Sequence, residues 1–265
     1  MASERVTDTW AHGDAYERYV GRWSRRVAPA FLDWLDLPGG LRWVDVGCGT
    51  GALSSAILDL ASPSSVIGVE PSAGFLGTAR EHLGDRVTFH QAGAEELPVA
   101  DGSADAVVSG LVLNFVPDHA RALREAARVA SGGTVAAYVW DYAEGMEFMR
   151  MFWDAAADVD PAAAELDEAA RFPVATAEGI AAAFAAASLT DVHVASLEIP
   201  TVFADFDDLW TPFLGGQGSA PSYVATLDDP IRDAVRDAVR DRVTPAADGS
   251  IAMVARAWAA RGAAG

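Results

Sequence analysis

A short run of glycines after an aspartate has the composition of a ligand-binding turn. Gly47, Gly49 and Gly51 follow Asp45 at alternate positions, and Glu70 stands nineteen residues after the last glycine. Glycines let a backbone turn sharply and approach a ligand closely, and a helix that begins after such a turn offers N–H groups to an anion. A carboxylate at a strand end can accept hydrogen bonds from both hydroxyls of a ribose. This spacing therefore predicts a pocket for an adenosine-type cofactor.

The elements that must position these residues alternate between strands and helices. Apolar runs predict strands over residues 41–46, 66–70, 86–90, 105–109, 133–140, 191–203 and 250–260. Amphipathic periodicity predicts helices over residues 52–60, 73–83, 118–129 and 176–188. This alternation indicates an α/β fold with a Rossmann-like, doubly wound sheet of seven strands. We expect the sheet to be mostly parallel, with helices on both faces.

The length of 265 residues suits a single α/β domain, which we expect over residues 1–265. The alternation stops twice after the strand at 133–140, and an aromatic helical segment precedes the first strand. The predicted segments are an N-terminal helical lid (1–38), a cofactor-binding core (39–140), a substrate-covering insertion (141–175), a helix and strand six (176–203), a second insertion (204–247) and the last strand (248–265).

The run D-x-G-x-G-x-G over residues 45–51 resembles the first motif of class I S-adenosylmethionine-dependent methyltransferases. The resemblance covers Leu41 to Trp140 and includes the acidic strand end at Glu70, the segment Ala92–Pro98 and the segment Ser131–Val135. The order and spacing look like the small-molecule branch of that superfamily, which contains ubiquinone- and menaquinone-type C-methyltransferases. The resemblance implies an antiparallel last strand that forms a hairpin with strand six. It also implies S-adenosylmethionine as cofactor and methyl transfer to a small aromatic or hydrophobic metabolite.

The resemblance also implies roles for single residues. Gly47 and Gly49 would line the methionine end of the cofactor, Asp45 would bind its ammonium group, and Glu70 would hold the ribose. Further cofactor contacts are expected from Tyr19, Arg22, Pro71, Ala94, Glu95 and Leu111.

Some of these roles have structural alternatives. Asp45 could cap the turn as a buried carboxylate, Tyr19 could pack the lead-in helix onto the sheet, and Leu111 could belong to the core. The chain also departs from the family pattern, because Gly93 replaces an aspartate that commonly accepts a hydrogen bond from the adenine amino group. Glu95 or a water molecule would then take that role.

The methyl acceptor should bind above the carboxyl ends of the strands. Aromatic residues after strand five and after strand six would line an apolar cavity there. These residues are Trp140, Tyr142, Phe148, Trp153, Trp210 and Phe213, and each could instead be core. In-line methyl transfer needs a base only where the acceptor must lose a proton. Asp141 is the candidate catalytic base, with a capping role as its alternative.

Composition limits the partners. Thirty-eight acidic and nineteen basic residues give a net charge of −19, which disfavours nucleic acids and other polyanions. No apolar run reaches the ~18 residues that a membrane span needs, and the single cysteine, Cys48, suits a reducing cytoplasm. No acidic or histidine cluster has metal-ligand spacing. We expect a cytoplasmic protein with a small-molecule substrate, with no metal, nucleic acid or membrane, and with a homodimer through the lead-in or residues 204–247 as an open alternative.

Two other functions stay open. Gly47, Gly49 and Ala52 also fit the loose dinucleotide pattern G-x-G-x-x-G/A, which would suit an NAD-type oxidoreductase. Such chemistry would want a Tyr-x-x-x-Lys pair, and the chain contains no lysine. The other alternative is a protein that binds S-adenosylmethionine without catalysing transfer, because an intact turn with Glu70 argues for binding alone.

Overall fold

The computed structural model describes residues 21–216 and 218–265, and contacts between Cα atoms divide the chain into two compact units. The sheet unit comprises Ser24–Trp140, Pro173–Leu197 and Ala257–Gly265. Of the described residues, the insertion unit comprises 21–23, Asp141–Phe172 and Glu198–Arg256. The insertion unit therefore gathers most of both predicted insertions. The single domain over residues 1–265 and its segment bounds stay predictions.

One seven-stranded sheet organises the fold, in the order β3-β2-β1-β4-β5-β7-β6. The strands are β1 (Arg42–Val46), β2 (Ser65–Val69), β3 (Thr88–His90), β4 (Ala106–Gly110), β5 (Thr134–Trp140), β6 (Thr190–Phe203) and β7 (Ile251–Ala263). Strands β1 to β5 pair in parallel, and β7 runs antiparallel to β5. The predicted sheet, mostly parallel with an antiparallel last strand, is confirmed.

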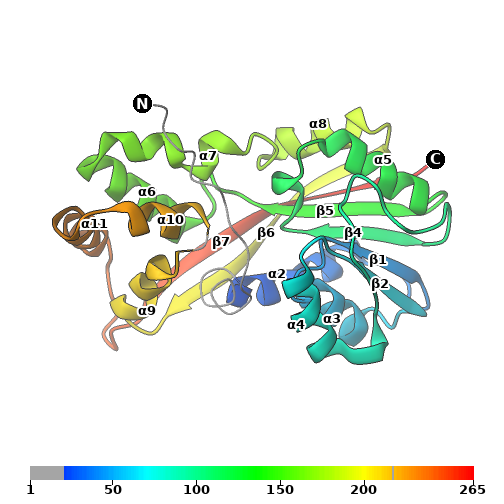
Figure 1. Ribbon diagram of the computed structural model, residues 1–265, viewed down its shortest axis with the longest axis horizontal. Helices are drawn as coiled ribbons and strands as arrows, with labels where there is room; N and C mark the ends of the chain where they lie inside the picture. The colour runs from blue at the N-terminus through cyan, green and yellow to red at the C-terminus, as the bar shows by residue number, and fades with distance from the viewer. Residues whose placement is uncertain (1–20, 217) are drawn as a thin grey trace. The chain divides into compact units, whose positions relative to one another are not determined.

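Helices cover both faces of the sheet within the sheet unit (Figure 1). Helices α3 (Ala52–Leu60) and α4 (Ala73–Leu83) lie on one face, and α5 (His119–Val129) and α8 (Ala177–Ala186) lie on the other. Because both faces are covered, a central strand such as β4 is apolar on both sides, and Ala106, Val107 and Val108 are at most 1% exposed.

Two strands differ from their predicted bounds by more than one residue, each for a local reason. Strand β3 begins at Thr88 and not at residue 86, because Gly84 ends α4 with a φ of 55° and Gly84–Arg86 form the 3-10 turn η2. Strand β7 continues to Ala263 and not to residue 260, because it pairs with the full length of β5. The pairs run from Trp140 with Ala257 to Thr134 with Ala263.

The order of the strands reverses at β1: β2 and β3 follow on one side of it, and β4 and β5 follow on the other. This reversal positions the candidate site. Strand β1 lies between β2 and β4, with Asp45 paired in register to Gly68 and Val108. In open α/β sheets, ligands bind at the carboxyl ends of the strands, at the point where the connections from two neighbouring strands run to opposite sides. The turns that follow β1 and β4 meet at this point.

The insertion unit is mainly helical. Its helices are α6 (Glu147–Val159), α7 (Glu168–Arg171), α9 (Phe206–Trp210), α10 (Ser219–Thr226) and α11 (Asp229–Asp241), with the 3-10 turns η4 (Pro161–Leu166) and η5 (Thr211–Leu214). Helix α6 packs against α10, α11 and η4. No helix in the described part of the chain is both long and apolar enough to cross a bilayer.

Candidate functional site

The turn after β1 is built from glycines in left-handed conformations. The φ angles of Gly47, Gly49 and Gly51 are 73°, 54° and 92°. A Cβ on Gly47 would lie 2.5 Å from a methyl carbon of Val112, whereas one on Gly49 would meet no atom within 4 Å. Gly47 is therefore needed for packing between the turns after β1 and β4. Gly49 leaves its side of the backbone open to a ligand.

Glu70, which follows β2, is held against this turn. Its carboxylate accepts one hydrogen bond from the Gly49 N–H at 3.1 Å and another from the Ser72 N–H at 2.9 Å. The residue is 7% exposed, and burial raises the pKa of its carboxyl above the usual value. Each oxygen accepts one bond and keeps capacity for another. The structure thus brings together Glu70 and Gly49, which the sequence predicted to share a site.

Asp45, near the end of β1, is a buried carboxyl with one unused oxygen. It is 1% exposed; its Oδ2 accepts a hydrogen bond from the Ser54 hydroxyl at 2.7 Å, and its Oδ1 has no partner among the described residues. Burial raises the pKa of this carboxyl to about 7, the Ser54 hydrogen bond lowers it, and the nearby charge of Glu70 raises it. A buried acceptor without a donor is costly, so a ligand that supplies a donor or a cation would suit it.

Asn114 is a polar residue of this region that the sequence prediction missed. It lies in the 3-10 turn η3 (Leu113–Phe115) after β4, and it is 6% exposed. Neither Oδ1 nor Nδ2 has a hydrogen-bond partner among the described residues. Two residues earlier, Val112 packs on Gly47. The available signal was one amide within the otherwise apolar run 111–116.

Leu111 holds the turn after β4 in a strained conformation. Its φ is 62°, an unusual value for a branched side chain, and its N–H donates to the Tyr138 carbonyl at 2.8 Å. Residues held in this region of φ and ψ cluster at binding and active sites. The strain agrees with the predicted cofactor contact of Leu111, which itself stays a prediction.

The segment expected beside the adenine is anchored to α5. Ala94 lines a narrow crevice of about 20 Å³ together with Val46, Val108 and Leu113. Arg128 on α5 donates to the carbonyls of Leu97 and Val99 at 3.0 and 2.9 Å. These bonds order the backbone that follows Ala94.

Two other predicted contacts on this side have protein partners. The Glu95 carboxylate accepts a hydrogen bond from the Asp118 N–H at 3.0 Å, where α5 begins. Pro71 is exposed, and its carbonyl accepts from the Gln91 amide at 3.0 Å. One oxygen of Glu95 thus serves the helix start, and its bond to adenine stays a prediction.

Two cofactor contacts were predicted from the lead-in, Tyr19 and Arg22. The described residues begin at residue 21, so Tyr19 lies outside them. Arg22, in α2 (Arg22–Leu35), pairs with Asp208 at 2.9 Å. Its guanidinium also lies over the rings of Trp23 and Phe203, at 4.5 and 4.8 Å from their centroids. A cofactor carboxylate would have to compete with Asp208 for this group.

Asp141 anchors the turn that follows β5. Its side chain is 3% exposed, and its Oδ2 accepts from the Arg256 guanidinium at 2.6 and 2.7 Å. Its Oδ1 accepts from the N–H groups of Ala143 and Glu144, both at 3.1 Å. These partners are those of a buried turn cap, the alternative to the catalytic base. The role as base stays a prediction.

The aromatic residues expected at the acceptor are buried. Trp140, in the sheet unit, is 2% exposed. In the insertion unit, Phe213 stacks on Phe152 at 4.4 Å and lies 6.4 and 5.9 Å from Phe148 and Trp210. The remaining members contact neighbouring rings: Tyr142 contacts Phe172, and Trp153 contacts Phe152 and Tyr223. These rings form much of the insertion unit's core, and their contact with substrate stays a prediction.

The described residues contain no group of three or more histidine, cysteine, aspartate or glutamate side chains that could hold a metal ion.

Sequence comparison adds a family. Residues 44–137 match the methyltransferase domain family. Within this segment lie the glycine turn, Glu70, Leu111 and Asn114.

A ubiquinone biosynthesis O-methyltransferase from Aromatoleum aromaticum is 38% identical over 117 residues, which cover 41% of this chain and 49% of that protein. The chain thus spans about half the length of that relative. The YcgJ protein of Bacillus subtilis has a similar fold, with a TM-score of 0.58 at 18% identity over 90% of this chain and 97% of that one. The phosphoethanolamine N-methyltransferase 2 of Haemonchus contortus aligns with a TM-score of 0.58 at 17% identity over 95% of this chain and 57% of that one.

The doubly wound sheet, the glycine turn and the acid after β2 define a Rossmann-like protein with a nucleoside-binding edge. With the match over residues 44–137, they show that this part of the chain resembles the methyltransferase domain of class I S-adenosylmethionine-dependent enzymes. The resemblance found in the sequence is confirmed.

Proposed function

We propose that this protein binds S-adenosylmethionine at the turn after β1 and transfers its methyl group to a small aromatic or hydrophobic metabolite. The single observation that carries the proposal is the position of Glu70. Its buried carboxylate is bound to the N–H of Gly49 while both oxygens keep hydrogen-bonding capacity. That arrangement suits the two hydroxyls of a ribose.

The other polar groups around this turn fit the rest of the cofactor. The Oδ1 of Asp45, which has no partner among the described residues, suits an ammonium group, and the open side of Gly49 leaves room for the methionine backbone. The buried amide of Asn114 offers a donor and an acceptor on the neighbouring turn. We assign Asn114 a contact to the bound cofactor, because a buried amide without partners is stable only where something else satisfies it.

The cofactor supplies an electrophilic methyl group on a sulfonium. A lone pair of the acceptor forms a bond to the methyl carbon while the carbon–sulfur bond breaks, and S-adenosylhomocysteine leaves as the thioether. An enzyme can accelerate this displacement largely by holding the two reactants close together and in line. The chain's contribution is to hold the ribose and ammonium ends so that the methyl group faces the acceptor. A proton, where the acceptor carries one, leaves to solvent or to a nearby base.

The acceptor class rests on composition and on a relative. The net charge of −19 disfavours polyanionic acceptors. The Aromatoleum relative is named as an O-methyltransferase of ubiquinone biosynthesis.

Compartment and assembly belong to the same proposal. Cys48 is buried, and burial raises the pKa of its thiol, so this lone cysteine is unreactive and suits a reducing cytoplasm. A homodimer through residues 1–38 or 204–247 stays a prediction.

Calorimetric titration of S-adenosylmethionine, S-adenosylhomocysteine and NAD into the purified protein tests the cofactor. We expect micromolar binding of the first two. Glu70→Ala should weaken it by about a hundredfold, since it removes charge-assisted bonds of roughly 1.5–3 kcal/mol each. The exposed Glu96→Ala is the matched control and should bind as the wild type does. Binding of NAD alone would favour an oxidoreductase and overturn the proposal.

Turnover is tested separately, by incubation with S-adenosylmethionine and a panel of phenols, quinols and aromatic amines. Mass spectrometry should detect S-adenosylhomocysteine together with a methylated product. Tight cofactor binding without product from any class in the panel would favour the binding protein without catalysis.

A further inference from the structure

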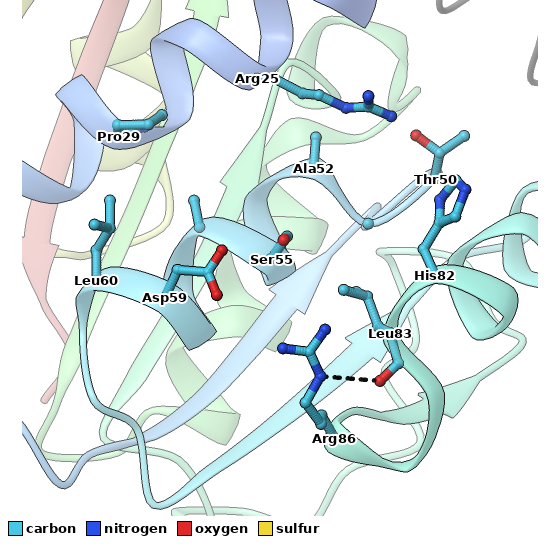
Figure 2. A pocket seen from close by; sticks show the side chains of 12 residues that line it. Arg25, Pro29, Thr50, Ala52, Ser55, Asp59, Leu60, His82, Leu83 and Arg86 are labelled. Carbon is cyan, nitrogen blue, oxygen red and sulfur yellow. Dashed lines mark hydrogen bonds between the residues drawn. The ribbon is translucent and has the colours of Figure 1, made fainter.

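A groove on the outer side of α3 is separate from the polar groups assigned to the cofactor. Its volume is about 490 Å³, which is the size of many small-ligand sites. It is lined by residues of α2, α3, α4 and η2, all in the sheet unit (Figure 2). Nothing in the proposed methyl transfer uses it.

The two faces of α3 separate the groove from the cofactor turn. Ser54 is fully buried and donates to Asp45 on the inner face. Ser55 and Asp59 both line the groove, and they lie one helical turn apart on the same face of the helix.

The groove concentrates positive charge on a strongly acidic protein. Arg25, His82 and Arg86 line it against a single acid, Asp59, although the chain has twice as many acidic as basic residues. Figure 2 shows Arg25 extending from α2 toward Thr50 and His82, and Arg86 extending from η2 toward Ser55 and Asp59.

Arg86 keeps most of its hydrogen-bonding capacity. It is exposed, and its Nε donates to the Leu83 carbonyl at 3.4 Å, a long bond. Its two terminal nitrogens form no ion pair with any described residue, and neither does Asp59 in the same groove. The planar guanidinium therefore presents two parallel donors to whatever enters.

We propose that this groove is a second binding site, for a small phosphorylated sugar. Arg86 binds the phosphate, since a planar guanidinium matches a pair of phosphate oxygens, and Arg25 adds positive charge to the groove. The hydroxyl of Ser55 and the imidazole of His82 supply further hydrogen bonds. Asp59 accepts from a sugar hydroxyl, which explains an acid inside a phosphate site. This proposal does not rest on methyl transfer.

The site also touches the cofactor turn, because Thr50, Gly51 and Ala52 line the groove. A Cβ on Gly51 would lie 2.7 Å from the Leu83 side chain, so the turn and the end of α4 are packed together. A ligand in the groove therefore contacts the backbone that holds the cofactor from its other side. We expect the two ligands to bind together and to alter each other's affinity reciprocally.

Calorimetric titration of ribose 5-phosphate into the full-length protein tests the site, with and without saturating S-adenosylhomocysteine. We expect binding in both conditions, at an affinity that falls as NaCl is raised. Ribose should not bind, and inorganic phosphate should bind at least tenfold more weakly than ribose 5-phosphate.

Three single-charge variants locate the bound phosphate. Arg86→Gln should weaken binding about tenfold, the cost of about one charge-assisted hydrogen bond. Asp59→Asn should weaken ribose 5-phosphate and tighten inorganic phosphate, because it removes a repelling charge and a hydroxyl acceptor together. Arg124→Gln, an exposed arginine of α5 outside the groove, is the matched control and should change nothing.

Absence of binding would overturn the proposal, and so would equal loss in Arg86→Gln and Arg124→Gln, which would indicate general charge attraction. Complete loss of binding in saturating S-adenosylhomocysteine would place the sugar phosphate in the cofactor pocket instead. Since titration without S-adenosylhomocysteine is included, failure of the methyltransferase proposal leaves this test intact.

Discussion

Two buried carboxyls, Asp45 and Glu70, face the same short turn, and they differ in what satisfies them. Glu70 receives two backbone N–H groups, whereas Asp45 receives one hydroxyl and keeps an oxygen without a partner among the described residues. Burial raises the pKa of both carboxyls, and that of Asp45 to about 7. At the scale of single residues, Asp45 is therefore the group most open to change when a cation binds.

Cofactor binding should be coupled to the ionisation of Asp45. Near pH 6 most Asp45 carboxyls are protonated in the free protein, since burial raises their pKa to about 7. The ammonium group of the cofactor, which stays charged below its pKa of about 7.7, favours the carboxylate. Binding at pH 6 should therefore release a proton, and affinity should rise about tenfold between pH 5.5 and 7.

Calorimetry in two buffers of different ionisation enthalpy measures that proton. Asp45→Asn, which is neutral at every pH, should bind more weakly and lose the pH dependence. A wild-type affinity that is flat from pH 5.5 to 7 would show that Asp45 does not meet the ammonium group.

Asn114 should trade stability for binding. Asn114→Leu, which is similar in volume, removes two buried polar atoms that have no partner among the described residues. It should raise the free energy of unfolding of the ligand-free protein by about 1 kcal/mol. The same change should weaken S-adenosylhomocysteine binding about tenfold, because one hydrogen bond is lost. Urea unfolding and calorimetry measure the two effects. A less stable ligand-free variant would mean that the amide has a structural partner.

At the scale of elements, the site is the meeting of two turns. The turn after β1 supplies glycines with positive φ, and the turn after β4 supplies Leu111, Val112 and Asn114. Each turn follows a buried strand, and the parallel register of Asp45 with Val108 sets their approach. Packing of Val112 on Gly47 then fixes the contact.

The glycines of the first turn should respond differently to alanine. Gly47→Ala adds a clash with Val112 to the strain of its φ, and should cost roughly 3 kcal/mol of unfolding free energy. Gly49→Ala has only the strain of its φ and should cost about 1 kcal/mol. The new methyl group of Gly49→Ala occupies the open side of the turn. The loss in free energy of cofactor binding should therefore exceed the loss in free energy of unfolding. Urea unfolding and calorimetry on both variants check this, and equal loss of stability would contradict it.

At the scale of the whole molecule, charge is the dominant feature. A net charge of −19 over 265 residues creates self-repulsion that opposes the compact state. Local ion pairs such as Arg42 with Asp105 and Arg150 with Asp167 offset only part of it.

Salt should therefore stabilise the protein. The Debye length falls from about 30 Å to below 10 Å between 0.01 and 0.2 M ionic strength, so the repulsion is screened. We expect the melting temperature at pH 7.5 to rise by several degrees over this range in NaCl, measured by differential scanning calorimetry. The rise should shrink at pH 4.5, where many carboxylates are protonated. A melting temperature that falls with salt would mean that attractive pairs outweigh the repulsion.

Local patterns in the chain were enough to predict the sheet and the part of the site formed by the glycine turn and Glu70. Apolar runs bounded by turn residues located all seven strands, and the glycine spacing with Glu70 located the cofactor turn. These signals are local, because strand periodicity and left-handed turns depend on neighbouring residues. Asn114 escaped because burial and missing partners belong to the folded chain, and a single asparagine carries no such mark in sequence.

Sequence alone therefore determined the fold class, the family resemblance and the residues of the first turn, since each depends on short-range pattern. Tertiary structure decided which polar groups are satisfied. In the folded chain Arg22 pairs with Asp208, and Asp141 pairs with Arg256. Polar atoms of Asp45 and Asn114 have no hydrogen-bond partner among the described residues. Folding also gathered Arg25, His82 and Arg86 into one groove. The physical reason is that hydrogen bonds and charges act over a few ångströms between residues far apart in the chain, and only folding sets those distances.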